Sequence, residues 1–102
     1  MTISALSTAV SGLLASAQQF RQSAHNVVNI NSDNFQAHDV RTVTQVSAGQ
    51  AAGVTTKTVP VDETSYVREF VVQSSAKVAY AANARVISSV EESLGALLDI
   101  SA

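Results

Sequence analysis

A heptad pattern of apolar residues, in a segment that lacks charge, constrains this chain more than any other feature. The spacing alternates between three and four residues over the first quarter of the chain and places one apolar stripe along a helix. No Pro interrupts the segment. The pattern predicts one helix over residues 3–29, packed through Leu6, Leu13 and Phe20. The full stripe is Ile3, Leu6, Val10, Leu13, Ala17, Phe20, Ala24 and Val27.

No charged side chain occurs between Met1 and Phe20, and the face opposite the apolar stripe is rich in Ser, Thr, Gln and Ala. An exposed amphipathic helix usually carries Lys and Glu on its outer face. This helix is therefore covered either by its own domain or by neighbouring chains in an oligomer. We favour the oligomer, because 102 residues form one small domain with few internal partners.

A second helix is predicted over residues 65–100, with Thr64 or Ser65 as the N-cap. Its stripe again alternates three and four residues, and comprises Gln73, Ala76, Tyr80, Asn83, Ile87, Val90, Leu94 and Leu97. A second apolar line on an adjoining face comprises Val67, Phe70, Val71 and Val78.

The middle segment, residues 30–64, does not continue the heptad pattern of the two helices. Asn26, Asn29, Asn31 and Asn34 end the first helix, and Asn34 suits the left-handed conformation of a turn before Phe35. Two β-branched runs, 40–46 and 54–59, then predict a β-hairpin with a seven-residue loop. An isolated hairpin is marginally stable, so we expect it to pack on a helix or on a neighbouring subunit.

The two helices each contain an interior glycine, Gly12 and Gly95. If the helices run antiparallel, the two glycines can lie at the same level, and Asn83 can set the register at some cost in stability. The second helix would then extend past the first and cover Phe35 with Tyr66 and Phe70. The predicted fold is mainly α, a single domain over residues 1–102. Its terminal helices pack as an antiparallel coiled-coil hairpin, with a small β-hairpin between them.

Composition excludes several classes of function. The net charge is −2 and only 14% of residues are charged, which argues against a nucleic-acid binder. There is no Cys, and no apolar stretch of about 18 residues predicts a membrane span. A charged leader is also missing, so we expect no cleaved signal peptide.

Catalytic patterns are missing from the sequence as well. His25 and His38 are the only histidines, and neither has a nucleophile or a second ligand at a useful spacing. Residues 49–53 lack the Lys of a phosphate-binding loop. We predict that the chain is not an enzyme and has no catalytic residue, cofactor, metal or small-molecule substrate.

Three blocks of sequence resemble flagellar basal-body rod and hook proteins. Residues 5–15, ALSTAVSGLLA, are similar to the family's opening pattern A-L-x-x-A-x-S-G-L-x-A. Residues 24–35, AHNVVNINSDNF, are similar to A-x-N-I-A-N-x-x-T-x-G-[YF], with Ser32 and Asn34 in place of Thr and Gly. Glu69, residues 80–87 and residues 94–98 resemble the closing block E-x(10)-Y-x-A-N-A-x-V-I with L-G-x-L-L. The short middle segment is similar to that of the smaller, proximal-rod-like members.

The resemblance implies a structural subunit of the bacterial flagellar rod. Such proteins leave the cell through the flagellar type III export apparatus without a cleaved signal. They assemble in the periplasm, with copies of themselves and with other rod proteins, into the axial drive shaft. The residues expected to carry assembly and packing are Leu6, Gly12, Leu13, Phe20, Asn26, Asn29, Phe35, Tyr80, Asn83, Ile87, Leu94, Gly95 and Leu97.

A second hypothesis stays open at this point. The same helices could form a soluble helical-hairpin adaptor or export chaperone that makes a small closed oligomer. The two hypotheses predict different oligomeric states. An adaptor stays one small species, whereas a rod subunit polymerises.

Overall fold

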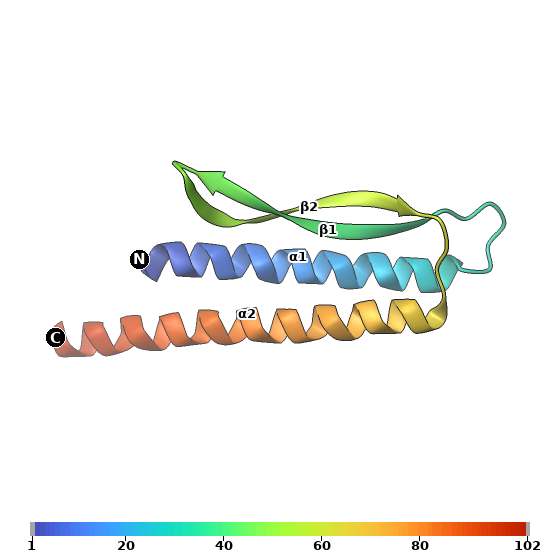
Figure 1. The fold of residues 1–102 in the computed structure, drawn as a ribbon. Helices are drawn as coiled ribbons and strands as arrows, with labels where there is room; N and C mark the ends of the chain where they lie inside the picture. The colour runs from blue at the N-terminus through green and yellow to red at the C-terminus, as the bar shows by residue number, and fades with distance from the viewer. Residues whose placement is uncertain (1, 102) are drawn as a thin grey trace.

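A computed structural model describes residues 2–101, which form a helix, a β-hairpin and a second helix. The elements are α1 (Thr2–Asn29), β1 (Ala37–Ser47), β2 (Gln50–Val61) and α2 (Tyr66–Ser101). This confirms the predicted pair of helices with a two-stranded antiparallel hairpin between them. The helices run in opposite directions, and α1 lies between the hairpin and α2 (Figure 1).

Single residues define where the segment between the two helices begins and ends. Asn34 adopts φ 58°, the left-handed conformation that its short polar side chain tolerates better than most. At the start of α2 the N–H of Arg68 donates to Ser65 Oγ at 3.1 Å, so Ser65 is the N-cap. The two helix ends therefore meet at one end of the molecule, which we call the closed end (Figure 1).

The hairpin turn is shorter than predicted. The seven-residue loop is wrong, because Ser47 pairs with Gln50 and only Ala48 and Gly49 lie between the strands. Their φ angles of 53° and 79° are typical of a type I′ turn, which matches the twist of antiparallel strands. The five other residues of the predicted loop lie in the strands, and a bulge where the register shifts between Thr44 and Val46 accommodates one extra residue of β2.

The register of the two helices also differs from the prediction. Gly12 faces the side chain of Asn83, whereas nothing lies within 4 Å of a Cβ built on Gly95. The two glycines are therefore not level. Because α2 is longer by eight residues (36 against 28) and the helices meet at the closed end, α2 extends about 12 Å past the N-terminal end of α1 (Figure 1). The prediction that the N-terminal half of α2 extends past α1 is therefore wrong, because the C-terminal end of α2 extends instead.

The core consists of small side chains. Its buried hydrophobic residues are Ala9, Ala15, Ala37, Val40 and Ala76, and its buried polar residues are Ser16, Ser23, Asn26 and Glu69. Small residues let backbones approach closely but bury little apolar area each.

The apolar stripe of α1 does not lie at the centre of the contact with α2. Val10 and Phe20 are 39% and 42% exposed, and Leu6 and Leu13 are half-buried. A stripe of small and polar residues faces α2 instead, and it includes Gly12, Ser16, Ser23 and Asn26.

The molecule is thin and elongated. It measures 62 × 28 × 15 Å and has a radius of gyration of 17.3 Å, against about 13 Å for a compact domain of this length. Its accessible surface is 7186 Å², against about 5,500 Å² for a compact protein of this mass. The chain therefore leaves much more surface exposed than a globular domain of the same size does.

Candidate assembly surfaces

A buried carboxylate organises the closed end. Glu69 is 0% exposed. Its Oε1 accepts hydrogen bonds from Asn26 Nδ2 at 3.1 Å, Thr64 Oγ1 at 2.5 Å and Arg68 Nη1 at 3.0 Å. Within residues 2–101, Glu69 Oε2 is the one buried side-chain oxygen or nitrogen that has no partner. A buried charge is tolerated when it is paired and hydrogen-bonded, and three donors on Oε1 meet that requirement.

Asn26 joins all three layers of the molecule. Besides its bond to Glu69 of α2, its Nδ2 donates to the carbonyl of His38 at 2.8 Å. Its Oδ1 accepts from the N–H of His38 at 3.4 Å and from Gln22 Nε2 at 3.1 Å. Each hydrogen-bonding group of this buried amide therefore has a partner on α1, β1 or α2.

Two further contacts close this end. Arg68 forms an ion pair with Asp39 of β1, and the hydrogen bond from Arg68 to the Asp39 carboxylate raises the pKa of the guanidinium. Ser23 Oγ donates to the backbone carbonyl of Glu69 at 3.0 Å in a buried position. These bonds fix the start of α2 against α1 and β1.

The hairpin is held on the uncharged polar face of α1. The N–H of Val54 donates to Ser11 Oγ at 3.1 Å, and Thr56 Oγ1 donates to Gln18 Oε1 at 2.8 Å. Gln19 Nε2 donates to the carbonyl of Val40 at 3.2 Å. The chain's own hairpin thus covers this face, which is the alternative that we did not favour from the sequence.

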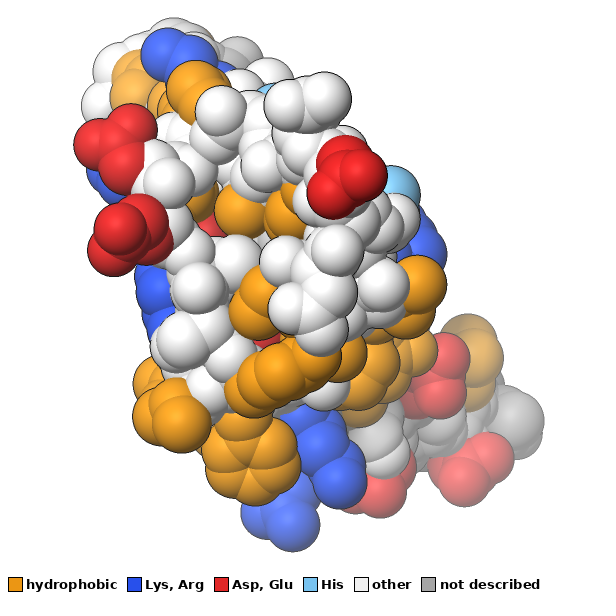
Figure 2. Space-filling view, turned by 90° about the vertical axis from the view of Figure 1, so that its right-hand side faces the viewer, with side chains coloured by type: hydrophobic (Ala, Val, Ile, Leu, Met, Phe, Trp, Pro, Cys, Tyr) orange, Lys and Arg blue, Asp and Glu red, His pale blue; other side chains and the backbone are white. Residues whose placement is uncertain are grey.

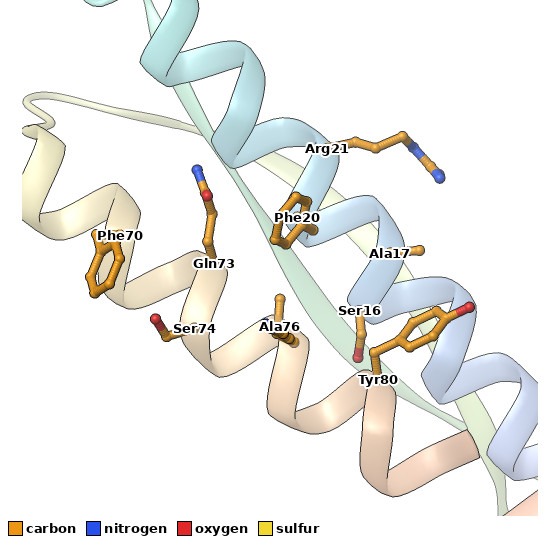
Figure 3. A pocket seen from close by; sticks show the side chains of 10 residues that line it. Ser16, Ala17, Phe20, Arg21, Phe70, Gln73, Ser74, Ala76 and Tyr80 are labelled. Atoms are coloured by element: carbon orange, nitrogen blue, oxygen red, sulfur yellow. The ribbon is translucent and has the colours of Figure 1, made fainter. Parts of the chain in front are cut away.

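A groove lies between α1 and α2 near the closed end. We call it the interhelical groove; its volume is about 680 Å³. Figure 3 shows Phe20, Gln73 and Ala76 lying between the helices, while Arg21 points outward. Tyr80 lines it from α2, beside Ser16 and Ala17 of α1. Lys77 of α2 completes a cationic rim with Arg21.

Large apolar side chains gather on the outside of α2. Phe70 is 70% exposed. Figure 2 shows hydrophobic side chains gathered along the lower part of the closed end, with Lys and Arg side chains beside them. Single exposed apolar residues are normal, but a continuous apolar surface marks an interaction site. The exposed large apolar residues of α2 are Tyr66, Val67, Phe70, Val71, Val78, Tyr80, Val86, Leu94, Leu97, Leu98 and Ile100.

The predicted assembly residues fall into four places. Leu6, Leu13, Asn83 and Ile87 lie half-buried along the helices, and Phe20 and Tyr80 lie more exposed at the interhelical groove. Leu94, Gly95 and Leu97 lie in the exposed end of α2. Three predicted residues lie at the closed end. Phe35 packs its ring against His25, with ring centroids 6.0 Å apart, and Asn26 is buried. Asn29 Nδ2 donates to the His25 carbonyl at 3.0 Å.

Sequence reasoning did not assign Glu69 a place in the site. Its signal was present, because continuing the stripe of α2 backward by seven residues from Ala76 reaches Glu69. A charged residue on a packing stripe needs a buried partner. Asn26 of α1 donates to the Glu69 carboxylate, and Ser23 of α1 donates to the Glu69 backbone carbonyl.

Residues 2–101 contain neither a metal-binding cluster nor a membrane-spanning helix. No group of three or more His, Cys, Asp or Glu side chains is placed to hold a metal ion. Neither described helix combines the length and the apolar character that crossing a membrane requires.

Comparison with known proteins identifies no relative: no protein-family model matches the chain, and no curated protein matches it.

Proposed function

We propose that this chain is a structural subunit of the bacterial flagellar basal-body rod. It polymerises through its terminal helices, with copies of itself and with other rod proteins, into the axial drive shaft. In this proposal the chain leaves the cell through the flagellar type III export apparatus without a cleaved signal peptide and acts in the periplasm. It uses no cofactor, nucleic acid or small-molecule substrate.

One observation carries the proposal: the distribution of apolar side chains. The core is made of Ala, Val, Ser, Asn and Glu, while the larger Leu, Phe and Tyr side chains of α2 lie outside. Burial of apolar surface drives both folding and association, at about 25 cal/mol per Å². An elongated subunit with this inside-out arrangement gains most of its apolar burial from neighbours.

The proposal also includes the predicted antiparallel coiled-coil packing of the two terminal helices. Heptad spacing on both helices supports it, as do the half-buried Asn83, Ile87 and Val90 of α2. The apolar stripe of α1 lies at the rim of the contact with α2 and keeps surface available to a helix of another subunit.

Fractionation of flagella tests the function directly. The tagged chain should copurify with hook–basal bodies from the source cells, and a deletion strain should lack rods and fail to swim. Gly12→Leu should prevent incorporation while the subunit is still exported, because the added side chain meets Asn83 of α2. Thr58→Leu places the same side chain at an exposed position of the hairpin and should assemble normally.

The rival hypothesis predicts a different result. An adaptor or export chaperone would sediment as one small closed oligomer at every concentration and would stay out of purified basal bodies. That outcome, with normal swimming of the deletion strain, would refute the rod proposal.

A further inference from the structure

Charge is divided between two regions of the helix pair. From Thr2 to Asn29, α1 carries one charged side chain, Arg21, and residues 70–90 of α2 carry only Lys77 and Arg85. The last part of α2, residues 91–101, carries only acidic charge, from Glu91, Glu92 and Asp99. Figure 2 shows acidic side chains at the far end of the molecule, away from the closed end.

We call residues 91–101 the acidic extension, and most of it has no α1 beside it. Residues 91–100 are all exposed, and Leu98 and Ile100 are 69% and 82% exposed. Acidic groups near a helix C-terminus interact unfavourably with the negative end of the helix dipole, and the last turn contains no basic residue. An isolated chain therefore holds this segment in an unfavourable setting on two counts, exposed leucines and uncompensated negative charge.

The interhelical groove has the complementary properties. Phe20 and Tyr80 give it apolar walls, buried Ala76 leaves room on its floor, and Arg21 and Lys77 give it a positive rim. An amphipathic helix docks in such a groove through residues spaced three, four and seven apart. Leu94 and Leu98 have that spacing, and Glu91 lies on the same side of the helix.

We propose that the acidic extension of one copy docks in the interhelical groove of a second copy. Leu94 and Leu98 pack between Phe20 and Tyr80, while the acidic side chains face Arg21 and Lys77. The groove lies near the closed end and the extension projects from the opposite end of α2 (Figure 1).

This contact joins two different surfaces, so it is heterologous, and the extension begins about 16 Å along α2 beyond Tyr80, the last groove residue. Repetition of such a contact gives a head-to-tail filament where the rotation between copies does not close, and a ring where it does. The inference rests on the proposed self-assembly and specifies which surfaces carry it.

Charge reversal of each half tests the contact. R21E/K77E gives the groove an acidic rim, and E91K/E92K/D99K gives the extension a basic one; all five residues are exposed. Each variant alone should associate at least roughly tenfold more weakly than the wild type in sedimentation velocity at low salt. An equimolar mixture should associate again, because the basic groove and extension of one variant each meet an acidic counterpart on the other.

A matched control removes net charge as the explanation. R41E/K57E has the same net charge as R21E/K77E, but it alters an exposed cross-strand pair of the hairpin. It should associate like the wild type, and circular dichroism should show equal helix content for all variants. Wild-type association in R21E/K77E, an equal loss in R41E/K57E, or a wild type that stays monomeric at all concentrations would overturn the proposal.

Disulfide trapping gives a second readout, which is clean because the chain has no Cys. S74C, at the groove, and L98C should form a mixed disulfide dimer when the two proteins are combined under mild oxidation. T58C on the hairpin should not crosslink to L98C, and equal yields from both pairs would contradict the docking.

These solution experiments separate the contact from the rod function. Restored association in the mixture, with no chain in basal bodies, would support the contact and refute the flagellar role. The reverse result would leave the rod proposal standing and refute this surface.

Discussion

Gly12 of α1 lies directly against the side-chain amide of Asn83 of α2, and a Cβ built on Gly12 would stand 2.8 Å from Asn83 Nδ2. Asn83 keeps its own hydrogen bond, from Nδ2 to the carbonyl of Ala79 at 2.9 Å. Because Gly12 has no side chain, the Asn83 amide can lie directly against α1 at this point. This one pair of residues therefore fixes how the two helices align along their length.

Alanine at the two helical glycines should have different effects. Gly95→Ala should stabilise the folded chain by up to about 1 kcal/mol, because Ala favours the helix and nothing lies within 4 Å of the new Cβ. Gly12→Ala should give little or no gain, because the Asn83 amide must move and lose a bond worth about 1 kcal/mol. Urea unfolding followed by circular dichroism measures both.

The pair is best isolated by a double-mutant cycle. In an Asn83→Ala background, Gly12→Ala should gain about 1 kcal/mol more than it does in the wild type. Equal gains for Gly12→Ala in the two backgrounds would show that Asn83 does not restrict position 12.

Gly53 should be the least replaceable residue of the hairpin. It has φ 116°, which side chains rarely adopt, and its Cβ would lie 2.7 Å from Ser11 Oγ, the acceptor for the N–H of Val54. Gly53→Ala should cost about 2 kcal/mol and increase hydrogen exchange at Val54. Gly49→Ala, with φ 79° but open space around it, should cost about 1 kcal/mol and leave the Val54 amide protected. Equal losses would indicate that strain alone, without the contact to Ser11, sets the cost.

The buried amide of Asn26 predicts a pH-dependent defect. In N26D a second carboxylate replaces the amide that donates to Glu69 at 3.1 Å, so burial and repulsion raise the pKa of the new carboxyl in the folded state. The variant should lose about 3 kcal/mol at pH 7. Below about pH 3 the new carboxyl is protonated in both states and most of this loss disappears, because the loss develops only as the pH rises through the unfolded pKa near 3.9.

Asn26→Leu, with the same number of side-chain heavy atoms and no charge, is the control for this prediction. Its loss of stability relative to the wild type should stay nearly constant between pH 4 and pH 7. Parallel pH curves for N26D and Asn26→Leu would argue against a buried carboxylate pair at this position.

Elements that depend on local periodicity could be predicted from the sequence. The alternation of three and four residues indicates a helix wherever it recurs, and the observed helices differ from the predicted ones by at most one residue at each end. The turn was missed because Ala48 takes a positive φ that its residue type does not signal. Asn or Gly is the usual residue there.

The packed face of α1 could not be chosen by hydrophobicity alone. Two heptad-spaced stripes exist on this helix, an apolar one and a small, polar one, and the rule of apolar burial selects the first. The second faces α2 because Asn26 donates to the Glu69 carboxylate and Ser23 to the Glu69 backbone carbonyl. Gly12 and Ser16 also allow close approach. This choice depends on residues more than 40 positions away, which periodicity does not detect.

The register of the helices follows from connectivity rather than from matched glycines. The hairpin leaves the end of α1, turns at Ala48–Gly49 and returns to the same end, so α2 must begin there. The extra length of α2 then projects at the other end, which places Gly95 beyond the helix pair and leaves the acidic extension exposed.

Exposed apolar side chains should matter to assembly and not to folding. Phe70 lines the interhelical groove and is 70% exposed, so Phe70→Ser should change the free energy of unfolding by no more than about 0.5 kcal/mol. The same change should weaken self-association roughly tenfold, because an aromatic side chain at a buried interface is commonly worth more than 1 kcal/mol. Val43→Ser makes a comparable change on the exposed hairpin and should leave both properties unaltered. Urea unfolding at low concentration and sedimentation at high concentration measure the two properties separately. A large loss of stability in Phe70→Ser would mean that this side chain supports the monomer, and the groove would then belong to the core rather than to an assembly surface.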